Sequence, residues 1–422
     1  MEQFANIKLS TVCDLYSGNS IKDDEKHLYE DPADAIPYIA TKDIDSNYLR
    51  ANYENGMYVK TNDSSFRHAP AGSTLLCLEG GSAGKKAAYV EREVAFVNKL
   101  CCLSPKGYDA RYLYYVVQSN DFTESFFSRA TGLISGVSVS ALKSIHVPKP
   151  PTSVQNAIGL YLRRETEQVD NLTTEIKKSV VLLREYRNFI ITEAVTRGLD
   201  LEVPTKVSKI NWIDTAPASW EYTRLGELCS RSIAYGIIKL NDEPATEGVP
   251  VFRCSDIHEG HLDTEGLRTV TKDLSDEYSR TILSGGEVLV NVRGTLGGCA
   301  IVPKEAAGWN IAREVAMIDL KSSVSSRYIK YFLLSDVFKA HMESNLAGSV
   351  YQGLNIELLE KTQLYLPRHE IQEKIANYLD AKTTEIDALI ASKERQVELL
   401  REYRKSIISE AVTGKFKVPG LE

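Results

Sequence analysis

The stretch LEGGSAGKKAAYV, residues 78–90, contains residue types that could do chemistry, at spacings typical of two different sites. Gly80-Gly81-Ser82-Ala83-Gly84 fits G-x-S-x-G, the turn that presents a nucleophilic serine in hydrolases. Gly84-Lys85-Lys86 is similar to the end of a phosphate-binding loop, but that loop requires G-x-x-x-x-G-K-[ST], and positions 79 and 86 are Glu and Lys. The stretch is therefore either a hydrolase candidate or a glycine-rich turn.

Other catalytic arrangements are missing from the sequence. A DNA methyltransferase would carry [D/N/S]-P-P-[Y/F/W], whereas the only Pro-Pro pair, Pro150-Pro151, lies between Lys149 and Thr152. We interpret Asp24-Glu25-Lys26 as an exposed charged loop rather than as nuclease carboxylates. The seven histidines show no repeated pairing with Ser82 or with Asp, and His258 with His261 is interpreted as loop surface. We therefore expect no catalytic residue, no cofactor and no metal.

Composition excludes several classes of protein. The seven cysteines are scattered and form no C-x-x-C pair, which predicts reduced thiols and no structural zinc. There is no run of about 18 apolar residues and no basic-then-apolar leader, so we expect a cytoplasmic protein. The net charge of -7 argues against nucleic-acid binding, although one basic face can coexist with an acidic remainder.

The chain repeats itself at a fixed spacing. LLREYRNFIITEAVT, residues 182–196, recurs as LLREYRKSIISEAVT, residues 399–413, with 12 of 15 positions identical at a spacing of 217 residues. The same spacing pairs Gln155 with Gln372 upstream. Because self-similarity at a fixed period is the signature of a repeated architecture, half of the protein is predicted to be a copy of the other half.

Both copies predict long helices with apolar residues at heptad spacing. The first copy has two apolar heptad positions, one with Leu162, Val169, Ile176, Leu183 and Ile190 and the other with Ile158, Leu172 and Tyr186. The second copy follows the same register, with Leu379, Ile386, Leu400 and Ile407 and with Ile375, Leu389 and Tyr403. Polar residues such as Glu165 and Lys393 interrupt these stripes, so we expect each helix to need the other in an antiparallel coiled coil.

The segments that precede the helices are short β-rich runs separated by Gly, Asn, Asp and Pro. Their similarity is faint but keeps its order, since IPYIATKDI at 36–44 answers VPVFRCSDI at 249–257. We predict an α+β fold in four parts: a first domain at 1–150, a helical region at 151–204, a second domain at 205–366 and a C-terminal helical region at 367–422. The repeat also predicts a pseudo-two-fold relation between the halves.

This arrangement resembles the specificity subunit of type I restriction-modification systems, over essentially the full chain. The resemblance rests on PPTSVQNAIGLYL and PRHEIQEKIANYL where the helices begin, on LLREYR and EAVT where they end, and on SWEYTRLGELC at the beginning of the second domain. In that family, two target-recognition domains alternate with two conserved helical regions. The first copy departs by having Ser153-Val154 where the second has Glu370-Ile371, which puts little in doubt.

The resemblance implies a non-catalytic DNA-recognition subunit. Each target-recognition domain would read one half of an asymmetric, bipartite site in double-stranded DNA, while two modification subunits methylate adenine and restriction subunits translocate and cut. Two readers held at a fixed separation suit such a site, because half-site spacing is a geometric property of the protein. Two alternatives remain open: a protein-interaction scaffold that reads no sequence, and a hydrolase that uses Ser82.

Specific reading of DNA requires Arg or Lys for guanine and phosphates and Asn or Gln for adenine, so we expect such donors on loops of both domains. The candidates in the first domain are Lys42, Arg67, Lys85 and Lys86. The candidates in the second domain are Arg231, Arg253, Arg293, Arg313, Tyr351 and Gln352. Arg253 and Arg293 are favoured because their segments match loops of the first domain.

Four arginines at repeated helix positions predict a surface that binds a partner protein. Arg184, Arg187, Arg401 and Arg404 are expected to be exposed, and they are candidates for docking the two modification subunits. The alternative is that they pair with glutamates of their own helix.

The repeat also decides how residues 78–90 are interpreted. At a spacing of 214 residues, Gly80 is matched with Gly294, Gly84 with Gly298, Ser82 with Leu296 and Lys85 with Cys299. The second copy thus keeps the glycines and lacks the serine and the lysine. We interpret the stretch as a tight β-connection whose backbone geometry requires glycine, with lysines that contact DNA.

Overall fold

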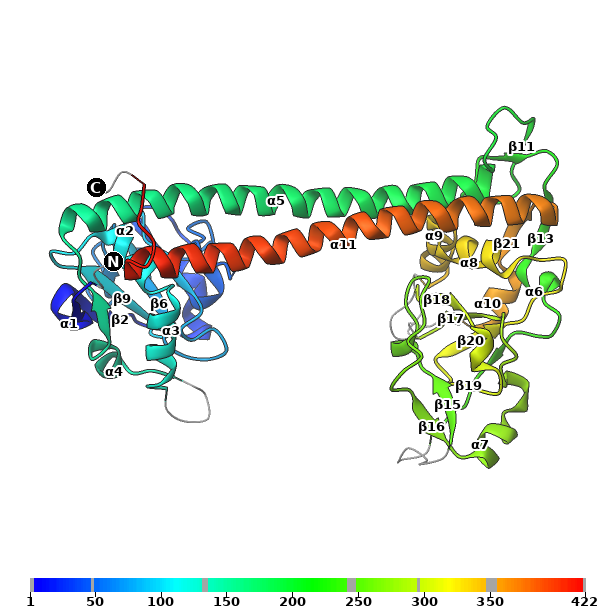
Figure 1. The fold of residues 1–422 in the computed structure, drawn as a ribbon, viewed down its shortest axis with the longest axis horizontal. Coiled ribbons are helices and arrows are strands. Elements are labelled where there is room, and N and C mark those ends of the chain that lie inside the picture. The colour runs from blue at the N-terminus through cyan, green and yellow to red at the C-terminus, as the bar shows by residue number, and fades with distance from the viewer. Residues whose placement is uncertain are drawn as a thin grey trace. The chain divides into compact units, whose positions relative to one another are not determined.

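Both long helices and both β-rich domains are present in the computed structural model, which describes residues 4–46, 49–130, 136–240, 248–293, 297–346 and 355–419 (Figure 1). Helix α5 spans Thr152–Arg197 and helix α11 spans His369–Thr413. The chain divides into two compact units, unit 1 with Met1–Lys178 and Lys393–Glu422, and unit 2 with Ser179–Ser392. Each unit contains one β-rich domain, the first half of one long helix and the second half of the other, so the predicted α+β class is confirmed.

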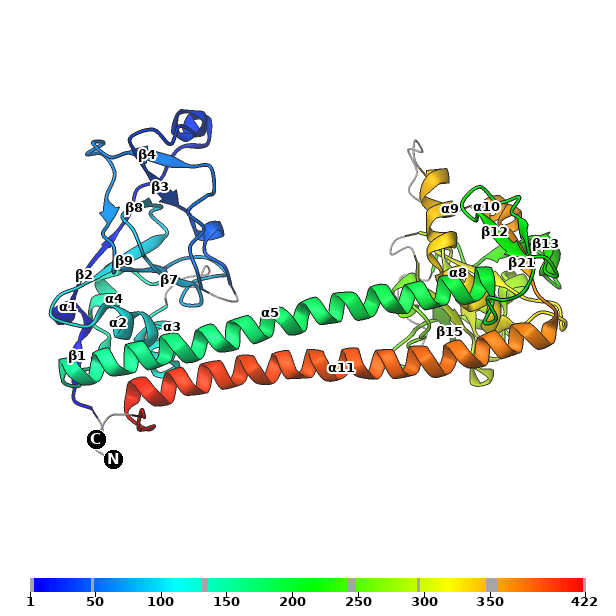
Figure 2. The same ribbon diagram turned by 90° about the horizontal axis from the view of Figure 1, so that it is seen from above.

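The first domain is built on two four-stranded sheets, ordered β2-β9-β6-β7 and β4-β3-β8-β5. Figure 2 shows β3, β4 and β8 grouped apart from β2, β7 and β9, which lie nearer to the helices. Its elements are β1 Asn6–Lys8, α1 Leu9–Val12, β2 Cys13–Ser17, η1 Asp23–Tyr29, β3 Ala35–Ile39, η2 Thr41–Asp43, β4 Tyr58–Lys60, β5 His68–Ala69, β6 Thr74–Cys77, β7 Ala87–Tyr89, β8 Val94–Phe96, β9 Leu100–Pro105, α2 Ala110–Val116, α3 Asn120–Phe127, α4 Val139–Lys143 and β10 His146–Pro148.

The second domain repeats this plan with a four-stranded sheet, β14-β20-β17-β18, and a three-stranded sheet, β16-β15-β19. Among the described strands, each domain has one parallel pair, β3 with β8 and β15 with β19. The elements are β11 Thr205–Val207, β12 Thr215–Pro217, β13 Glu221–Arg224, α6 Leu225–Leu228, β14 Ala234–Tyr235, β15 Val249–Phe252, η3 Cys254–Asp256, β16 Arg268–Val270, α7 Lys272–Glu277, η4 Ser279–Thr281, β17 Val288–Asn291, β18 Cys299–Ile301, η5 Lys304–Ala306, β19 Asn310–Ile311, β20 Val315–Ile318, α8 Ser326–Leu334, α9 Asp336–Leu346, α10 Ile356–Lys361 and β21 Gln363–Leu366.

Each domain shares a hydrophobic core with the long helices of its own unit. In unit 1, Ile158 and Leu162 from the start of α5 join Ile408 and Val412 from the end of α11 in the core of the first domain. In unit 2, the end of α5 and the start of α11 enter the core of the second domain in the same way. The helices therefore pair antiparallel within each unit, as predicted. No helix among the described residues is both long enough and apolar enough to cross a membrane.

The burial of the long helices confirms one predicted heptad position and corrects the other. The first position is buried at Leu162, Val169, Ile176 and Ile190 and at Leu379, Ile386 and Ile407. At the second position, the prediction was wrong for four side chains that are 46–51% exposed: Leu172, Tyr186, Leu389 and Tyr403. The second contact stripe lies four residues after the first instead of three, at Thr166, Thr173, Val180 and Arg187 and at Thr383, Ile390, Val397 and Arg404.

Threonine can occupy this stripe because its hydroxyl finds a partner on its own helix. Thr166 donates to the carbonyl of Leu162 and Thr383 to that of Leu379, both at 2.7 Å. A buried hydroxyl that is hydrogen-bonded avoids most of its desolvation penalty. A search for apolar residues alone therefore misses the stripe, and the exposed leucines and tyrosines are left on the solvent side.

The glutamines where the helices begin fix the orientation of each domain. Gln155 and Gln372 are both 1% exposed. Each accepts a hydrogen bond from the backbone N–H of an N-cap residue, Asp109 of α2 or Ser325 of α8, at 2.8 Å. Each also donates to the carbonyl of the proline five residues earlier, at 2.8 and 2.9 Å. The proline-to-glutamine motif thus joins three backbone segments in both units.

In each unit, a tyrosine of the β-rich domain holds the end of a long helix, α11 in unit 1 and α5 in unit 2. The hydroxyl of Tyr112 donates to the carbonyl of Val412 at 2.7 Å, and that of Tyr328 donates to the carbonyl of Val195 at 3.1 Å. Both valines belong to the repeated EAVT sequence at the helix ends. Buried Tyr hydroxyls require such partners, so the same contact attaches the end of a long helix to the β-rich domain in both units.

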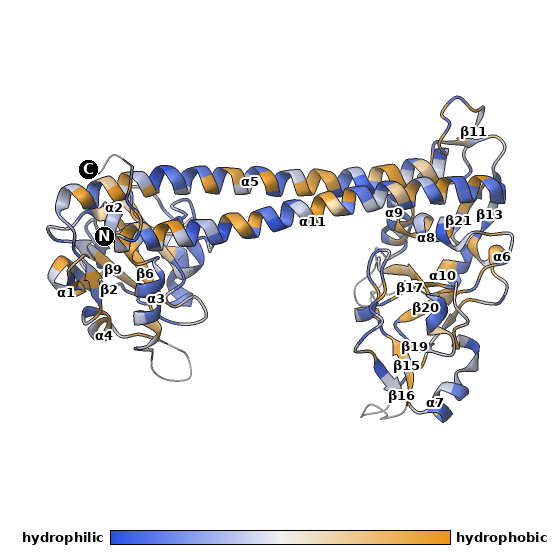
Figure 3. Ribbon diagram, in the orientation of Figure 1, coloured by the Kyte–Doolittle hydropathy of each residue, from blue (hydrophilic) through white to orange (hydrophobic). Residues whose placement is uncertain are grey.

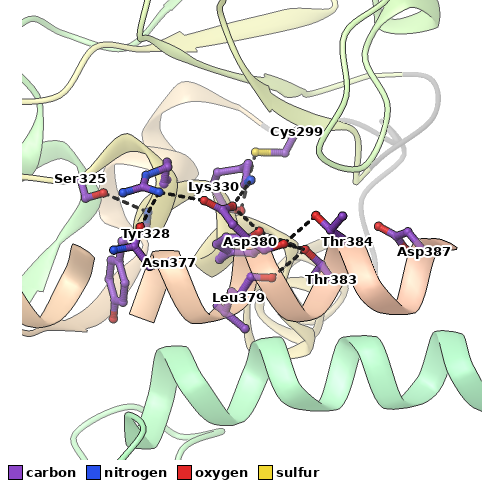
Figure 4. Close-up of polar contacts among 12 residues, drawn as sticks. Cys299, Ser325, Tyr328, Lys330, Asn377, Leu379, Asp380, Thr383, Thr384 and Asp387 are labelled. Atoms are coloured by element: carbon purple, nitrogen blue, oxygen red, sulfur yellow. Dashed lines mark hydrogen bonds and ion pairs between the residues drawn. The ribbon is translucent and has the colours of Figure 1, made fainter. Parts of the chain in front are cut away.

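In unit 2, an ionic cluster also joins α8 to α11 (Figure 4). Asp380 accepts a hydrogen bond from the Tyr331 hydroxyl at 2.6 Å and forms ion pairs with Arg327 at 2.9 Å and Lys330 at 3.5 Å. Partial burial raises the pKa of Asp380. The combined effect of its three partners is larger and opposite, so the pKa lies below the ordinary value of 3.8. The corresponding residue of unit 1 is Arg163, which pairs with Glu167 of its own helix at 2.9 Å.

We expect Asp380→Asn to destabilise unit 2 by about 1–2 kcal/mol at pH 7, because Tyr331 and two cations lose a charged acceptor. A carboxylate with a lowered pKa contributes stability above its ordinary value of 3.8, and that contribution is lost as the pH falls through the lowered value. The difference between variant and parent should therefore shrink from pH 5 to pH 3, as measured by chemical denaturation. A constant difference over this range would contradict the ionic explanation.

Candidate nucleic-acid interface

A pocket of about 460 Å³ in the second domain is lined by three arginines among other residues. The residues that line it are Ile233, Ala234, Tyr235, Gly236, Ile238, Tyr278, Arg280, Arg293, Arg313 and Ile356. Exposed guanidinium groups beside aromatic rings can donate to bases and phosphates and can stack on bases. We define these three arginines with Tyr235 and Tyr278 as the arginine pocket.

The strands of the second domain set the geometry of the arginine pocket. Tyr235 ends β14, Arg293 follows β17, and Arg313 lies between β19 and β20. At Gly236 a Cβ atom would lie 1.8 Å from the carbonyl oxygen of Ile311, so only glycine allows β14 to pass this closely to β19. The close passage brings Tyr235 to the arginines of the neighbouring connections.

Arg280, Arg293 and Arg313 are all exposed. Arg313 has an acidic neighbour, Glu314, at 3.7 Å, which is a loose surface ion pair. Burial raises the pKa of the Tyr235 hydroxyl, with the charge of Arg293 acting in the opposite direction. At neutral pH the pocket therefore offers a neutral phenol and three cations. Two of the predicted DNA contacts, Arg293 and Arg313, come together here, with Arg280 as a member that the sequence analysis missed.

Two further candidates of the second domain are engaged in ion pairs within that domain. Arg231 is close to Asp319 at 2.8 Å and to Glu287 at 3.3 Å, and the Glu287 side chain is only 2% exposed. Arg253 places two guanidinium nitrogens on Asp256, at 3.2 and 3.1 Å. Their predicted role at DNA is untested, and in this structure both guanidinium groups stabilise the fold.

Tyr351 and Gln352, the last two candidates of the second domain, lie outside the described residues. The four candidates of the first domain lie within the described residues. Two of them, Lys42 on η2 and Lys85, are exposed, and their side chains form no hydrogen bond or ion pair with other described residues. Arg67 is exposed and donates to the carbonyl of Ser17 at 3.2 Å. Lys86 is half-buried and donates to the carbonyl of Thr41 at 3.2 Å, so it ties its loop to η2.

Lys85 lines a second pocket, of about 590 Å³, between its loop, α2, α3 and the end of α11 in unit 1. Arg401, Arg404 and Lys405 contribute three more cations, and Glu398 and Glu402 contribute two carboxylates. This mixture of charges is less suited to DNA than the arginine pocket, because the carboxylates compete with phosphate for the same cations.

The G-x-S-x-G stretch forms a turn, as interpreted above. The carbonyl of Ser82 accepts from the backbone N–H groups of Lys85 and Lys86, at 3.1 and 3.2 Å. Gly84 has a φ of +66°, and a Cβ atom there would lie 2.7 Å from the ring of Phe126. Glycine is thus required by conformation and by packing.

One part of the sequence alignment of this stretch was wrong. Leu76 of β6 pairs with Ala87, whereas the equivalent Val290 of β17 pairs with Cys299. Cys299 therefore corresponds to Ala87 and not to Lys85, because the connection in the first domain is two residues longer. The connection in the second domain includes residues 294–296, which lie outside the described residues.

The helix arginines divide into two kinds, which corrects the expectation that all four are exposed. Arg187 and Arg404 have side chains that are 12% exposed, and each pairs with an aspartate of the other long helix, Asp387 at 2.8 Å and Asp170 at 3.1 Å. Arg184 and Arg401 are exposed, and Arg401 pairs with Glu398 of its own helix at 2.7 Å. Arg187 and Arg404 are therefore parts of the helix–helix contact.

The cysteines and histidines support no competing chemistry in the described residues. All seven cysteines are free thiols, six of them buried. Across the described ranges, no group of three or more His, Cys, Asp or Glu side chains is arranged to hold a metal ion. His258 and His261 both contact Asp263, at 2.9 and 3.3 Å, on the surface.

Comparison with known families identifies the class of protein to which this fold, with its two similar domains and two long helices, belongs. The family model described as the type I restriction modification DNA specificity domain matches residues 1–181 and 217–399, and the chain belongs to this family. It is a DNA sequence-specificity subunit of a type I restriction-modification system, and it is not itself an enzyme. The resemblance inferred from the sequence is confirmed.

Individual relatives are distant but extend over most of the chain. The chain is 22% identical to the type I restriction enzyme EcoBI specificity subunit of Escherichia coli, over 98% of this chain and 86% of that protein. It is 24% identical to the MjaVIII specificity subunit of Methanocaldococcus jannaschii, over 91% of this chain and 87% of the relative.

Solved structures share the fold at low sequence identity. A chain from a study of complex assembly and conformational transition of the type I R-M system matches with a TM-score of 0.75 at 16% identity, over 99% of both chains. The HsdS subunit of Thermoanaerobacter tengcongensis matches with a TM-score of 0.54 at 17% identity, over 98% of this chain and 97% of that one.

Proposed function

We propose that each β-rich domain reads one half of an asymmetric, bipartite DNA site and that the chain positions modification and restriction subunits on it, in the cytoplasm. The observation that carries the DNA-reading part is the arginine pocket, which is lined by three exposed arginines and two tyrosines. Two domains with one scaffold and different surface residues suit a site whose halves differ. Arg293 and Arg313 act at the DNA in this proposal, together with Lys42, Arg67 and Lys85 of the first domain.

The partner proteins would dock on apolar side chains that both units leave exposed. Unit 1 exposes Leu172, Leu399 and Tyr403, and unit 2 exposes their repeats Leu389, Leu182 and Tyr186, all between 46% and 63%. Figure 3 shows hydrophobic residues continuing along both helices. Exposed large apolar side chains at repeated positions favour a protein interface, and their presence in both units supports two equivalent modification subunits. Arg184 and Arg401 lie on these same helix segments and would form the polar rim.

We expect Leu399→Glu with Tyr403→Glu to abolish binding of one modification subunit and leave the other in place. Leu182→Glu with Tyr186→Glu should do the same in unit 2, because a carboxylate at an apolar interface is desolvated without a partner. Native mass spectrometry of the purified complexes would show one modification subunit for each double variant instead of two. Two bound subunits in both variants would exclude this surface.

The function is tested with the chain in complex with its modification subunits. Incubation with random DNA, followed by sequencing of methylated adenines, should yield one split sequence with two defined halves. Exchange of residues 1–150 for those of another family member should change one half only. A methylated product without an enriched sequence would favour the scaffold alternative, in which the domains hold proteins and read no bases.

A further inference from the structure

Strand registers identify equivalent positions in the two domains. Leu76 of β6 and Val290 of β17 each pair with the first residue of the next strand, β7 or β18, and with the second residue of β9 or β20. Tyr235 pairs with that second residue in β20, and Ser17 pairs with it in β9. These pairs provide a residue-by-residue correspondence that the faint sequence similarity does not.

At two corresponding positions, the two domains carry side chains with different hydrogen-bonding properties. Arg293 and Glu79 both lie three residues after the reference pair in β17 and β6, and Arg313 and Asn98 both lie three residues before it in β20 and β9. The residues next to them are joined by the same backbone hydrogen bond at 2.9 Å in both domains, Leu78 N to Lys99 O and Val292 N to Glu314 O. Glu79 and Asn98 are exposed, as Arg293 and Arg313 are.

One cation is common to both domains. The N–H of Gly72 donates to Val90 at 2.7 Å, and the N–H of Gly286 makes the equivalent bond to Val302 at 2.8 Å. Counted back from these glycines, Arg67 lies five residues earlier and Arg280 six residues earlier, one position apart. Every DNA site presents phosphates, whereas only the bases differ between half-sites. A shared arginine therefore suits the phosphates, and positions that change from domain to domain suit the bases.

We propose that the two changing positions select bases, so that the second domain reads guanine through Arg293 and Arg313, and the first domain reads cytosine through Glu79 and adenine through Asn98. This inference rests on the proposed function. Arginine donates two hydrogen bonds to O6 and N7 of guanine, asparagine pairs with N6 and N7 of adenine, and glutamate accepts from the N4 amino group of cytosine. Arg67 and Arg280 hold the backbone of each half-site.

The test uses the complex with modification subunits and compares methylated sequences from a random DNA library. The double variant R293E/R313N should lose methylation of the parental sequence by roughly 10- to 100-fold per position, with the change confined to guanines of one half-site. The double variant E79R/N98R should instead change the other half, toward guanine. Arg280→Ala and Arg67→Ala should weaken DNA binding equally for all sequences and reduce its salt dependence.

Lys272→Ala is the matched control, because Lys272 is an exposed cation of the second domain that pairs with Asp276 on α7. It should leave the methylated sequence and the rate unchanged. A folded R293E/R313N complex that methylates the parental sequence with unchanged preference would overturn the inference, and so would a second-domain half-site without a G·C pair. Methylation of a split sequence in those experiments would leave the proposed function standing, whereas methylation without any split sequence would overturn both.

Discussion

Gly236→Ala is expected to unfold the second β-rich domain and to leave unit 1 folded. The new Cβ atom would lie 1.8 Å from the carbonyl oxygen of Ile311, which is backbone and cannot rotate away. That carbonyl also accepts from the N–H of Ile237 at 2.8 Å, so β14 cannot move aside without losing the bond. Overpacking that separates two strands places the substitution among the exceptional ones, at about 4 kcal/mol or more. A loss of this size approaches the whole stability of many domains.

Tryptophan fluorescence separates the two units, because all three tryptophans of the chain, Trp212, Trp220 and Trp309, lie in unit 2. Gly236→Ala should shift or abolish the fluorescence transition in urea. Gly18→Ala, whose Cβ would lie 1.9 Å from the carbonyl oxygen of Phe96, should lower the circular dichroism signal and spare the fluorescence transition. Gly81→Ala is the control, since its Cβ meets no atom within 4 Å, and it should change stability by less than about 0.5 kcal/mol. A fluorescence transition equal to the parental one in Gly236→Ala would refute the packing argument.

The repeat and the heptads made the architecture predictable, because local periodicity and self-similarity are properties of the sequence itself. The second contact stripe of the helices was not predictable in this way. It contains Thr166 and Thr383, whose hydroxyls become acceptable only because a carbonyl of their own helix accepts a hydrogen bond from them, and Arg187, which becomes acceptable only beside Asp387. The partner of Arg187 lies 200 residues away in the chain, so the local sequence does not indicate it.

The residue types of the candidate site could be predicted from the sequence, but which arginines form ion pairs within the domain could not. Arg231, Arg253 and Arg293 look alike in the sequence, yet the first two are paired with carboxylates of their own domain and the third lines the arginine pocket. Arg280 was missed because nothing in the sequence distinguishes it from other surface cations of the second domain. Its relation to Arg67 rests on the equivalent backbone hydrogen bonds of Gly286 and Gly72, which exist only in the folded chain.

The repeated ion pairs of the long helices should differ widely in energy although their residues are the same. We expect Arg404→Met to destabilise unit 1 by about 3 kcal/mol, because Asp170 is 9% exposed and would keep only a longer ion pair, to Arg50 at 3.9 Å. Burial already raises the pKa of Asp170 against the effect of Arg404, and removal of the arginine should raise it further. A carboxylate with a raised pKa in the folded state is least destabilising when protonated, so the deficit of Arg404→Met should shrink as the pH falls from 7 toward 4.

Arg187→Met is the matched substitution in unit 2 and should cost less than about 1 kcal/mol, because its partner Asp387 is 52% exposed and regains water when the arginine is removed. The double variant Asp170→Asn/Arg404→Met should recover most of the stability lost in Arg404→Met, since it leaves no buried charge. Urea denaturation followed by circular dichroism for unit 1 and by tryptophan fluorescence for unit 2 measures all three. Equal losses in Arg404→Met and Arg187→Met would mean that burial of the aspartate does not set the energy of the pair, and that both arginines contribute chiefly through the packing of their aliphatic stems.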